Sequence, residues 1–376
     1  MEKRAFKKTG EEISLLGFGC MRLPRVDPEK QDIDYEKAAE MIDCAYKSGV
    51  NYFDTAYVYH EQLSEPFLGE VMQQYPRETF NLATKMPSWL LNSIDDAKRI
   101  FEEQLKRCRV DHFDFYLAHG LNRDRIKISE NLKLYDYLKF EQRQGRITNL
   151  GFSFHDEPHL LEQVLDMHEW DFAQIQLNYM DWDLQDARGQ YDLLAKRDMP
   201  IVVMEPVRGG TLATLSEDAR NTLSNAEPGS TPASWGMRFA GQLPNVLTVL
   251  SGMSTLEQVE DNVKTFSPLA PLSPEKMSIL QDALVAYNKS GAVPCTGCRY
   301  CMDCPFGVDI PKVFAVYNQY CVTQNKIAFG INYRVLGEAH NAHRCVACRK
   351  CVPFCPQFID IPEQIRKVVE AIDNNS

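Results

Sequence analysis

The sequence contains no long hydrophobic run and no surplus of basic residues. No stretch approaches the ~18–20 apolar residues that a membrane-spanning helix needs, and the charged N-terminus is not followed by the apolar segment of a secretory signal. Acidic residues outnumber basic ones, 52 to 41, for a net charge of −11, which disfavours nucleic acid and anionic membranes as partners. We therefore expect a soluble, cytoplasmic protein with no membrane or nucleic-acid partner.

Histidine is absent from two cysteine-rich runs near the C-terminus, and each run closes with Cys-Pro. The first run contains Cys295, Cys298, Cys301 and Cys304, and the second contains Cys345, Cys348, Cys351 and Cys355. Thiolates at this spacing can surround one iron–sulfur cube, while the cysteine before the proline reaches the other cluster. Structural zinc is the alternative, but it prefers well-separated Cys pairs or Cys mixed with His. Either site needs free thiolates and thus a reducing compartment.

The spacing predicts two 4Fe–4S clusters with crossed ligands. One would be held by Cys295, Cys298, Cys301 and Cys355, and the other by Cys345, Cys348, Cys351 and Cys304. The first run has two residues before its last cysteine, a shorter gap than bacterial ferredoxins have. Cys304 is therefore the ligand that departs from the pattern. The segments Cys304–Pro311 and Cys355–Pro362 agree at Cys, Pro, Asp, Ile and Pro, which indicates a duplicated half-site.

Short apolar runs alternate with amphipathic stretches from the N-terminus to about residue 265. The runs predict eight strands, at Leu15–Gly19, Val50–Asp54, Phe80–Thr84, Phe113–Ala118, Ile147–Phe152, Phe172–Gln176, Ile201–Met204 and Val246–Leu250. Helical patterns between them include Glu36–Lys47, Asp95–Arg109, Glu130–Gln144, Glu157–His168 and Leu184–Lys196. Such alternation is typical of an α/β protein of the (β/α)8 TIM barrel type. A doubly wound open sheet is the alternative, but its G-x-G-x-x-G loop is missing.

Proline and serine punctuation at Pro268–Pro274 indicates the end of the barrel, and Pro274–Lys289 has a helical pattern. Between the cysteine runs, Lys312–Leu336 is compatible with helix, which favours a helical ferredoxin over a compact β-hairpin type. The predicted organisation is a barrel over residues 1–270, a linker helix over 271–290 and a small, mainly helical ferredoxin-like domain over 291–376.

Functional residues of TIM barrels lie at the C-terminal ends of the strands. The segments Asn51–Tyr59, Ala83–Lys85 and Asp114–His119 end or follow three predicted strands. Together they resemble the aldo-keto reductase family at all four positions of its catalytic tetrad. The resemblance covers residues 1 to about 265, and it implies that the catalytic residues are Asp54, Tyr59, Lys85 and His119.

The roles that the resemblance implies are chemically consistent. A carbonyl that accepts hydride becomes an alkoxide and needs a proton, but a phenol with a pKa near ~10 is a reluctant donor at neutral pH. A buried Lys85 ammonium is expected to lower the pKa of Tyr59, while Asp54 holds that ammonium in place. His119 is expected to orient the carbonyl oxygen by a hydrogen bond.

The resemblance also implies a nicotinamide cofactor, NAD(H) or NADP(H). Ser153 and Gln174 look like the residues that bind the carboxamide, and Met204 stands where the family often stacks a tyrosine on the ring. The next loop carries Arg208, Gly209 and Gly210. This loop could meet the pyrophosphate through a guanidinium fork and a close backbone approach, or it could be simply a glycine-rich turn.

The adenosine-binding stretch after the eighth strand matches the family in place but not in charge. Its residues are Gly252, Ser254, Gln258 and Asn262. Where NADP-dependent members offer Lys and Arg to the 2′-phosphate, this chain has Gly252 and Gln258. NADH, or weak discrimination between the two dinucleotides, is therefore plausible.

The sequence as a whole indicates an oxidoreductase that interconverts small-molecule carbonyls and alcohols and carries an iron–sulfur electron-transfer module. Hydride transfer moves two electrons at once, whereas each cluster takes one, and no flavin motif is recognisable to convert between them. A redox protein partner is one use for the clusters. The competing hypothesis is an electron-transfer or interaction protein in which the barrel is a scaffold.

Overall fold

The structure, a computed structural model, describes residues 1–27, 30, 32–302 and 304–374. The chain divides into two compact units. The first contains Met1–Pro206 and Gly236–Leu272, and the second contains Val207–Trp235 and Ser273–Ser376. The grouping of Val207–Trp235 with the C-terminal region was not expected from the sequence.

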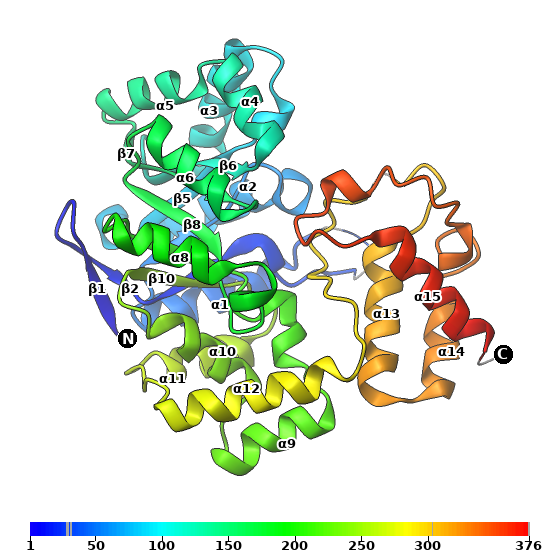
Figure 1. Cartoon of the computed structure of the whole chain (residues 1–376). Helices are drawn as coiled ribbons and strands as arrows, with labels where there is room; N and C mark the ends of the chain where they lie inside the picture. Colours follow the sequence, from blue (N-terminus) through cyan, green and yellow to red (C-terminus); the bar gives the residue numbers. More distant parts are fainter. Residues whose placement is uncertain (28–29, 31, 303, 375–376) are drawn as a thin grey trace. The chain divides into compact units, whose positions relative to one another are not determined.

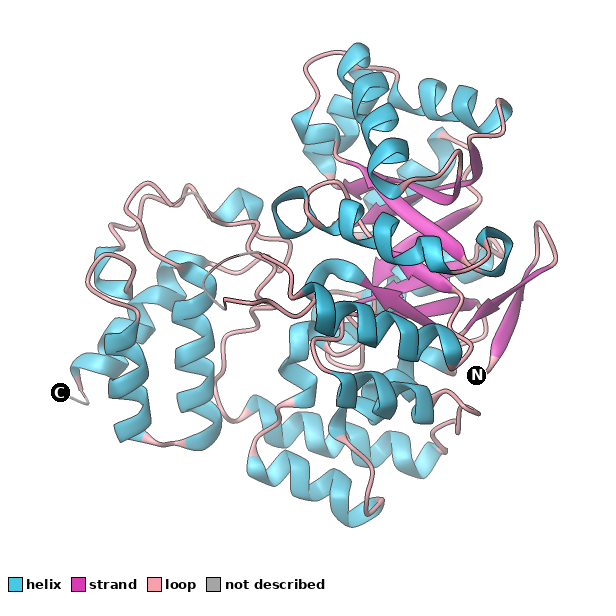
Figure 2. Cartoon of the chain, turned by 180° about the vertical axis from the view of Figure 1, so that it is seen from behind, coloured by secondary structure: helices cyan, strands magenta, loops and turns pink. Residues whose placement is uncertain are grey.

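The first unit is built on a closed barrel of eight parallel strands, as predicted (Figure 1). In barrel order the strands are β10 (Val246–Ser251), β3 (Leu16–Gly19), β4 (Tyr52–Asp54), β5 (Asn81–Met86), β6 (Phe113–Leu121), β7 (Ile147–Phe154), β8 (Phe172–Gln176) and β9 (Ile201–Met204). Most of their residues are buried on both faces, which explains why they read as continuous apolar runs. Figure 2 shows the strands in magenta with helices around them.

An antiparallel hairpin precedes the barrel, formed by β1 (Lys3–Phe6) and β2 (Glu11–Ser14). Its inward side chains Phe6 and Ile13 are fully buried and join the aromatic core inside the barrel, where Phe6 packs on Phe115 with ring centroids 5.5 Å apart. The hairpin thus adds to the barrel's hydrophobic core. It was not predicted from the sequence.

Helices surround the barrel strands. They are α1 (Tyr35–Lys47), α2 (Ser64–Val71), α3 (Ile94–Cys108), α4 (Arg123–Asn131), α5 (Leu134–Arg143), α6 (Pro158–Met167), α7 (Asp181–Leu184), α8 (Ala187–Lys196), α10 (Pro232–Gly241) and α11 (Leu256–Thr265). Helix α3 begins with a capping box between Ser93 and Asp96 and ends at Arg109 in the left-handed region. The single predicted helix Glu130–Gln144 is instead two helices, because Lys133 has a φ of 53°.

The second unit is helical, and its described residues contain no strand. Its helices are α9 (Glu217–Ala226), α12 (Pro274–Asn288), α13 (Ile310–Thr323), α14 (Lys326–Val335) and α15 (Ile361–Asp373). The repeat seen in the sequence has a structural reason, because each Cys-Pro is followed by an Asp-Ile-Pro that begins a helix, α13 or α15, with proline in the first turn. Gln324, with a φ of 55°, separates α13 from α14.

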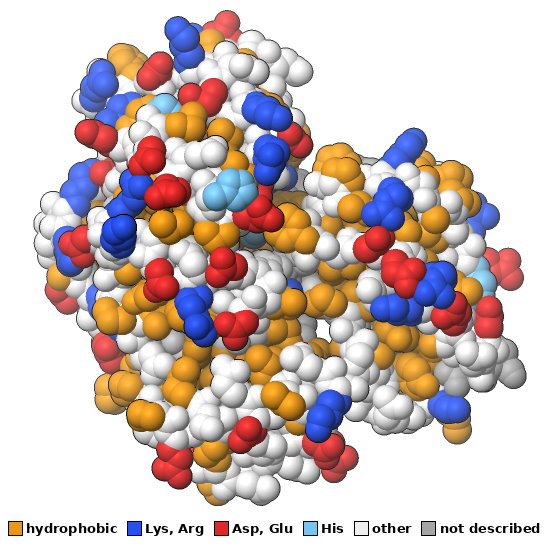
Figure 3. Space-filling view, viewed as in Figure 1, with side chains coloured by type: hydrophobic (Ala, Val, Ile, Leu, Met, Phe, Trp, Pro, Cys, Tyr) orange, Lys and Arg blue, Asp and Glu red, His pale blue; other side chains and the backbone are white. Residues whose placement is uncertain are grey.

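Short 3-10 helices complete the elements. They are η1 (Cys20–Arg22), η2 (Tyr59–Gln62), η3 (Met72–Gln74), η4 (Arg77–Thr79), η5 (Ser88–Leu90), η6 (Arg208–Ala213), η7 (Ala342–Arg344) and η8 (Val352–Phe354). In the described part of the chain, no helix has the length and apolar content to cross a membrane. On the face shown in Figure 3, acidic and basic side chains are interspersed, so the net negative charge is not gathered into one patch there.

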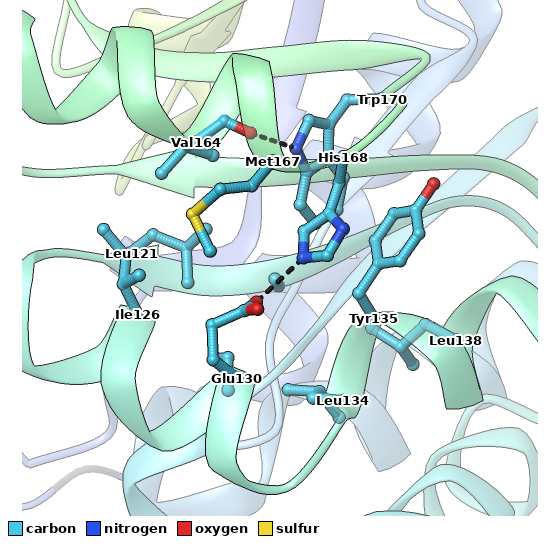
Figure 4. Close-up of a pocket in the computed structure, with 12 residues that line it drawn as sticks. Leu121, Ile126, Glu130, Leu134, Tyr135, Leu138, Val164, Met167, His168 and Trp170 are labelled. Atoms are coloured by element: carbon cyan, nitrogen blue, oxygen red, sulfur yellow. Dashed lines mark hydrogen bonds and ion pairs between the residues drawn. The ribbon is translucent and has the colours of Figure 1, made fainter.

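A mainly apolar pocket lies among β6, α4, α5 and α6 of the first unit (Figure 4). On one wall, Tyr135 stacks on His168 with ring centroids 3.9 Å apart, and His168 Nε2 lies 2.8 Å from Glu130 Oε1. Trp170 donates its indole N–H to the Val164 carbonyl oxygen at 3.1 Å. No residue of the predicted tetrad lines this pocket.

Candidate functional site

Three barrel strands and one short helix bring the predicted tetrad together. Asp54 ends β4, while Lys85 and His119 lie near the C-terminal ends of β5 and β6. These strands are parallel neighbours in the barrel, so their ends meet at one rim. Tyr59 begins η2, in the loop that leaves β4.

Lys85 and Asp54 form a buried ion pair at this rim. The Lys85 ammonium donates to Asp54 Oδ1 at 2.5 Å and to the Thr55 carbonyl oxygen at 2.7 Å. The side chains of Lys85 and Asp54 are only 1% and 4% exposed. A buried pair is maintained only when both charges are held by good geometry, and here a backbone oxygen supplies a further acceptor. Lys85 Nζ lies 5.0 Å from the centre of the Tyr59 ring.

The protonation of Tyr59 differs from the sequence-based expectation. Burial raises the pKa of Tyr59 well above its usual 10, and the charges of Asp54 and Glu205 raise it further. The expected lowering by Lys85 is not seen, because the ammonium donates to Asp54 and Thr55 while desolvation disfavours the phenolate. Tyr59 is therefore a protonated phenol at neutral pH.

His119 is a neutral imidazole between two aromatic side chains. Its ring centroid lies 6.1 Å from that of Tyr59 and 4.9 Å from that of Trp89. Burial lowers the pKa of His119 well below 6.5, and the nearby charges of Lys85 and Arg125 lower it further. Arg125 in turn lies 3.9 Å over the Trp89 ring. Sequence reasoning missed both residues, because their only signal is spatial: Trp89 packs on His119, and Arg125 lies over Trp89.

Buried polar atoms at the rim lack partners within the described residues. They are Gln174 Oε1, Asp54 Oδ2 and His119 Nδ1. The Gln174 amide nitrogen lies 3.7 Å from the Met204 sulfur, so both predicted cofactor residues of β8 and β9 are brought together. A buried acceptor without a partner is costly, and a carboxamide N–H2 group could donate to Gln174. The residues present therefore fit a nicotinamide.

Two other predicted cofactor residues are already hydrogen-bonded to the barrel. The Ser153 hydroxyl accepts from the Gly120 N–H at 2.6 Å, which ties β7 to the residue after His119. Asn262 is buried and donates to the Ser251 hydroxyl at 3.0 Å, which ties α11 to the end of β10. Both side chains thus order the rim on which a dinucleotide would lie.

Arg22 lies beside the predicted adenosine-binding stretch. A Cβ atom at Gly252 would lie 3.2 Å from the Arg22 side chain, and the Ser254 hydroxyl donates to the Arg22 carbonyl oxygen at 2.7 Å. Arg22 also pairs with Glu205 at 3.3 Å. Gln258 accepts from the Ser254 N–H at 2.8 Å. Sequence reasoning missed Arg22, which approaches this stretch from the opposite end of the barrel sequence.

The structure places Arg208, Gly209 and Gly210 in the second unit, where they form the start of η6. Arg208 is 0% exposed. Its guanidinium donates to the Pro294 carbonyl oxygen at 2.6 Å and to Gln357 Oε1 at 2.9 Å. Their assignment to the cofactor pyrophosphate remains a sequence-based prediction, and the contacts of Arg208 are with the cysteine-rich region.

The eight cysteines gather in the crossed sets that the spacing predicts. One cavity is lined by Cys295, Cys298, Cys301 and Cys355. The other set is Cys351 with Cys345, Cys348 and Cys304, which lie close enough for their charges to raise the pKa of Cys351. Four thiols around one cavity fit the donor set of an iron–sulfur cube.

The two sets differ in their exposure to solvent. Cys301 is buried, at 8% exposed, whereas Cys348 is exposed together with its neighbours Val346, Arg349 and Lys350. The first set therefore lies deeper in the second unit than the second set.

Comparison with known proteins gives two matches along the chain. The sequence profile of the Aldo/keto reductase family matches residues 15–285, and that of the 4Fe-4S dicluster domain matches residues 294–359. The L-galactose dehydrogenase of Arabidopsis thaliana is 25% identical, over 74% of this chain and 92% of that protein. The NADH-specific methylglyoxal reductase of Escherichia coli is 27% identical, over 58% of this chain and 71% of that protein.

The fold is also found among solved structures. An aldo-keto reductase from Klebsiella pneumoniae in complex with NADPH has a TM-score of 0.59 at 19% identity, covering 76% of this chain and 96% of that one. The family profile spans most of the chain, and a scaffold role for the barrel is accordingly not favoured. The chain therefore belongs to the aldo/keto reductase family, and it is an oxidoreductase with a 4Fe–4S domain at its C-terminus.

Proposed function

We propose that the barrel interconverts a small carbonyl compound and its alcohol with a nicotinamide cofactor, at the site formed by Asp54, Tyr59, Lys85 and His119. The observation that carries the proposal is the buried Lys85–Asp54 pair beside Tyr59, at the barrel rim where TIM-barrel chemistry occurs. Dependence on NAD(P) is general to the family. The dinucleotide would supply or accept the hydride, and the side chains manage the proton and the position of the carbonyl.

Tyr59 is the proton donor in this proposal. Its raised pKa keeps the phenol protonated at neutral pH, which suits donation to an alkoxide as it forms. His119, held neutral by its lowered pKa, offers a hydrogen bond to the carbonyl oxygen without repelling Lys85. At neutral pH, Tyr59 is thus in the protonation state that carbonyl reduction requires.

The contacts to the dinucleotide are proposed from the rim residues. Gln174 and Ser153 would bind the carboxamide, Met204 would pack on the ring, and Gly252, Ser254, Gln258 and Asn262 would line the adenosine. Neither Gly252 nor Gln258 offers charge to a 2′-phosphate, so we propose that NADH binds at least as well as NADPH. Arg22, whose side chain lies beside Gly252, is a candidate for a phosphate contact.

The C-terminal domain is proposed to hold two 4Fe–4S clusters with the crossed ligand sets. The cavity shared by the first three cysteines of one run and the last cysteine of the other supports this assignment. Because Cys348 is exposed, the cluster nearer the solvent would exchange single electrons with a redox protein partner.

The tetrad is tested by Tyr59→Phe, with Tyr57→Phe as the matched control. Tyr57 lies in the same loop, but its hydroxyl donates to Glu103 at 2.8 Å. Across a panel of small aldehydes and ketones, Tyr59→Phe should lose at least ~100-fold in turnover with unchanged NADH affinity, because the hydroxyl acts only as the alkoxide forms. Tyr57→Phe should remain active. Wild-type turnover by Tyr59→Phe would remove Tyr59 as the donor.

The cluster assignment is tested by iron and sulfide analysis of protein prepared without oxygen. Two cubes require about eight of each per chain. Cys304→Ser and Cys355→Ser should each disturb a different cluster, seen by electron paramagnetic resonance. A reproducible iron content half as large, or stoichiometric zinc, would contradict the crossed pair.

A further inference from the structure

Arg208 connects the two cysteine-bearing segments of the second unit. Its guanidinium donates to the carbonyl oxygen of Pro294, the residue before Cys295, and to the side chain of Gln357, which follows Cys355 by two positions. Gln357 itself lines the cavity of the first cysteine set. One fully buried cation thus holds both segments that supply thiols to the same cavity.

The backbone next to Arg208 is equally close to this region. Gly209 has a φ of +63°, and a Cβ atom there would lie 2.2 Å from the Thr296 carbonyl oxygen. Any side chain at position 209 would therefore push the loop away from the first cysteine run. The absence of a side chain lets the Gly209 backbone lie against Thr296, between Cys295 and Cys298.

We propose that Arg208 is a positioning residue of the first cluster, which sets the geometry of its ligands and raises its reduction potential. The inference rests on the proposed pair of clusters. A cube with four thiolates gains negative charge when it takes up an electron, and a cation held nearby in a low-dielectric interior stabilises that reduced state. Arg is always charged in proteins, and its planar fork can serve two acceptors at once. Two of its acceptors are the Pro294 carbonyl oxygen and the Gln357 amide oxygen.

This role differs from the pyrophosphate contact that the family resemblance implied for Arg208, and one set of variants separates the two. Arg208→Gln removes the charge, Arg208→Lys retains it, and Gln357→Glu places a carboxylate against the guanidinium without removing it. Arg238→Gln is the matched control, because Arg238 is another buried arginine, 4% exposed, that donates to a backbone carbonyl oxygen within the first unit.

The full chain, prepared anaerobically, is titrated with dithionite and mediators while electron paramagnetic resonance follows each cluster. In Arg208→Gln and Gln357→Glu, one cluster should become at least tenfold harder to reduce, which is about 59 mV for a one-electron couple. The other cluster should not move. Arg208→Lys should keep most of the wild-type potential, and Arg238→Gln all of it.

Unchanged potentials in Arg208→Gln and Gln357→Glu, with full iron content, would overturn the inference. So would a loss of NADH affinity in Arg208→Gln with both potentials unchanged, which would assign Arg208 to the dinucleotide. If Arg208→Gln fails to assemble, the other two variants still test the inference. A charge effect predicts a lower reduction potential in Gln357→Glu and a nearly unchanged one in Arg208→Lys. Wild-type protein without two cube signals would instead contradict the proposed clusters themselves, so the two failures are distinguishable.

Discussion

Asp54 and His119 are buried and Tyr59 is partly buried. Desolvation is the largest cause of the pKa shift of each. Burial raises the pKa of both acids and lowers that of the imidazole, so all three are driven toward their neutral forms. Lys85 opposes the shift only for Asp54, to which it donates directly. Because the Lys85 ammonium donates its hydrogen bond to Asp54, it lowers the pKa of Asp54 and not that of Tyr59.

Asp54→Asn should lower the pKa of Tyr59, because after burial the Asp54 charge is the largest cause that raises it. Carbonyl reduction needs the protonated phenol, so the rate should begin to fall at a lower pH in the variant than in the wild type. The pH dependence of kcat/KM for reduction measures this. Glu205→Gln should give a smaller shift in the same direction, and an upward shift in Asp54→Asn would contradict the electrostatic account.

His155 should make the first unit less stable in mild acid. Burial, with the charge of Arg125, lowers the pKa of His155 from 6.5 to about 4. Between these values the unfolded chain binds a proton that the folded chain does not, so the free energy of unfolding falls as the pH decreases from 6.5 toward 4. His155→Asn should flatten this decline in urea unfolding at a series of pH values. An identical decline in both proteins would rule out His155 as its source.

At the scale of elements, the strands were predictable because each is an apolar run buried on both faces. The four proposed tetrad residues were located by the family resemblance, and they lie near one another because the ends of such runs converge in a barrel. The breaks at Lys133 and Gln324 were not, since a left-handed residue inside a helical pattern depends on tertiary packing. The same is true of Arg22 and Trp89, whose partners lie far away in the sequence.

Gly69 in α2 should resist substitution. A Cβ atom at this position would lie 2.3 Å from the Arg107 carbonyl oxygen and 2.6 Å from the Cys108 backbone, so α2 and the end of α3 would have to separate. Gly69→Ala is expected to destabilise the first unit by ~1–3 kcal/mol, measured as a lower midpoint of thermal unfolding.

Gly330 in α14 should tolerate the substitution by alanine that Gly69 resists. No described atom lies within 4 Å of a Cβ built there, and its φ is not positive. Gly330→Ala should therefore raise the stability of the second unit by ~0.4–1 kcal/mol through a less flexible unfolded chain. Equal effects of the two substitutions would show that close packing at Gly69 is not the cause.

At the scale of the whole molecule, the discontinuity of the second unit could not be predicted from the sequence. Contacts such as that of Arg208 with Gln357 join residues 149 positions apart, and no local sequence pattern predicts them. The core of this unit packs against the proposed cluster ligands Cys295, Cys304, Cys345, Cys351 and Cys355.

Removal of iron with a chelator should consequently loosen both parts of the second unit together. Amide hydrogen exchange should accelerate in α13 and α15 and also in Val207–Trp235, while the barrel strands stay protected. Mass spectrometry of peptides from each region measures the change. Protection of Val207–Trp235 that stays at the level of the barrel strands would show that this segment is stabilised independently of the clusters.

The discontinuous unit also limits how the chain can be dissected for biocatalysis or crystallisation. A truncation after Leu272 deletes α12 but retains α9, which packs against it. The buried face of α9, with Ala219 and Leu223, would then be open to water, as would the buried Arg208. An isolated barrel made by deletion alone would expose an apolar surface that promotes aggregation. A usable one requires residues 207–235 to be redesigned as an ordinary barrel loop.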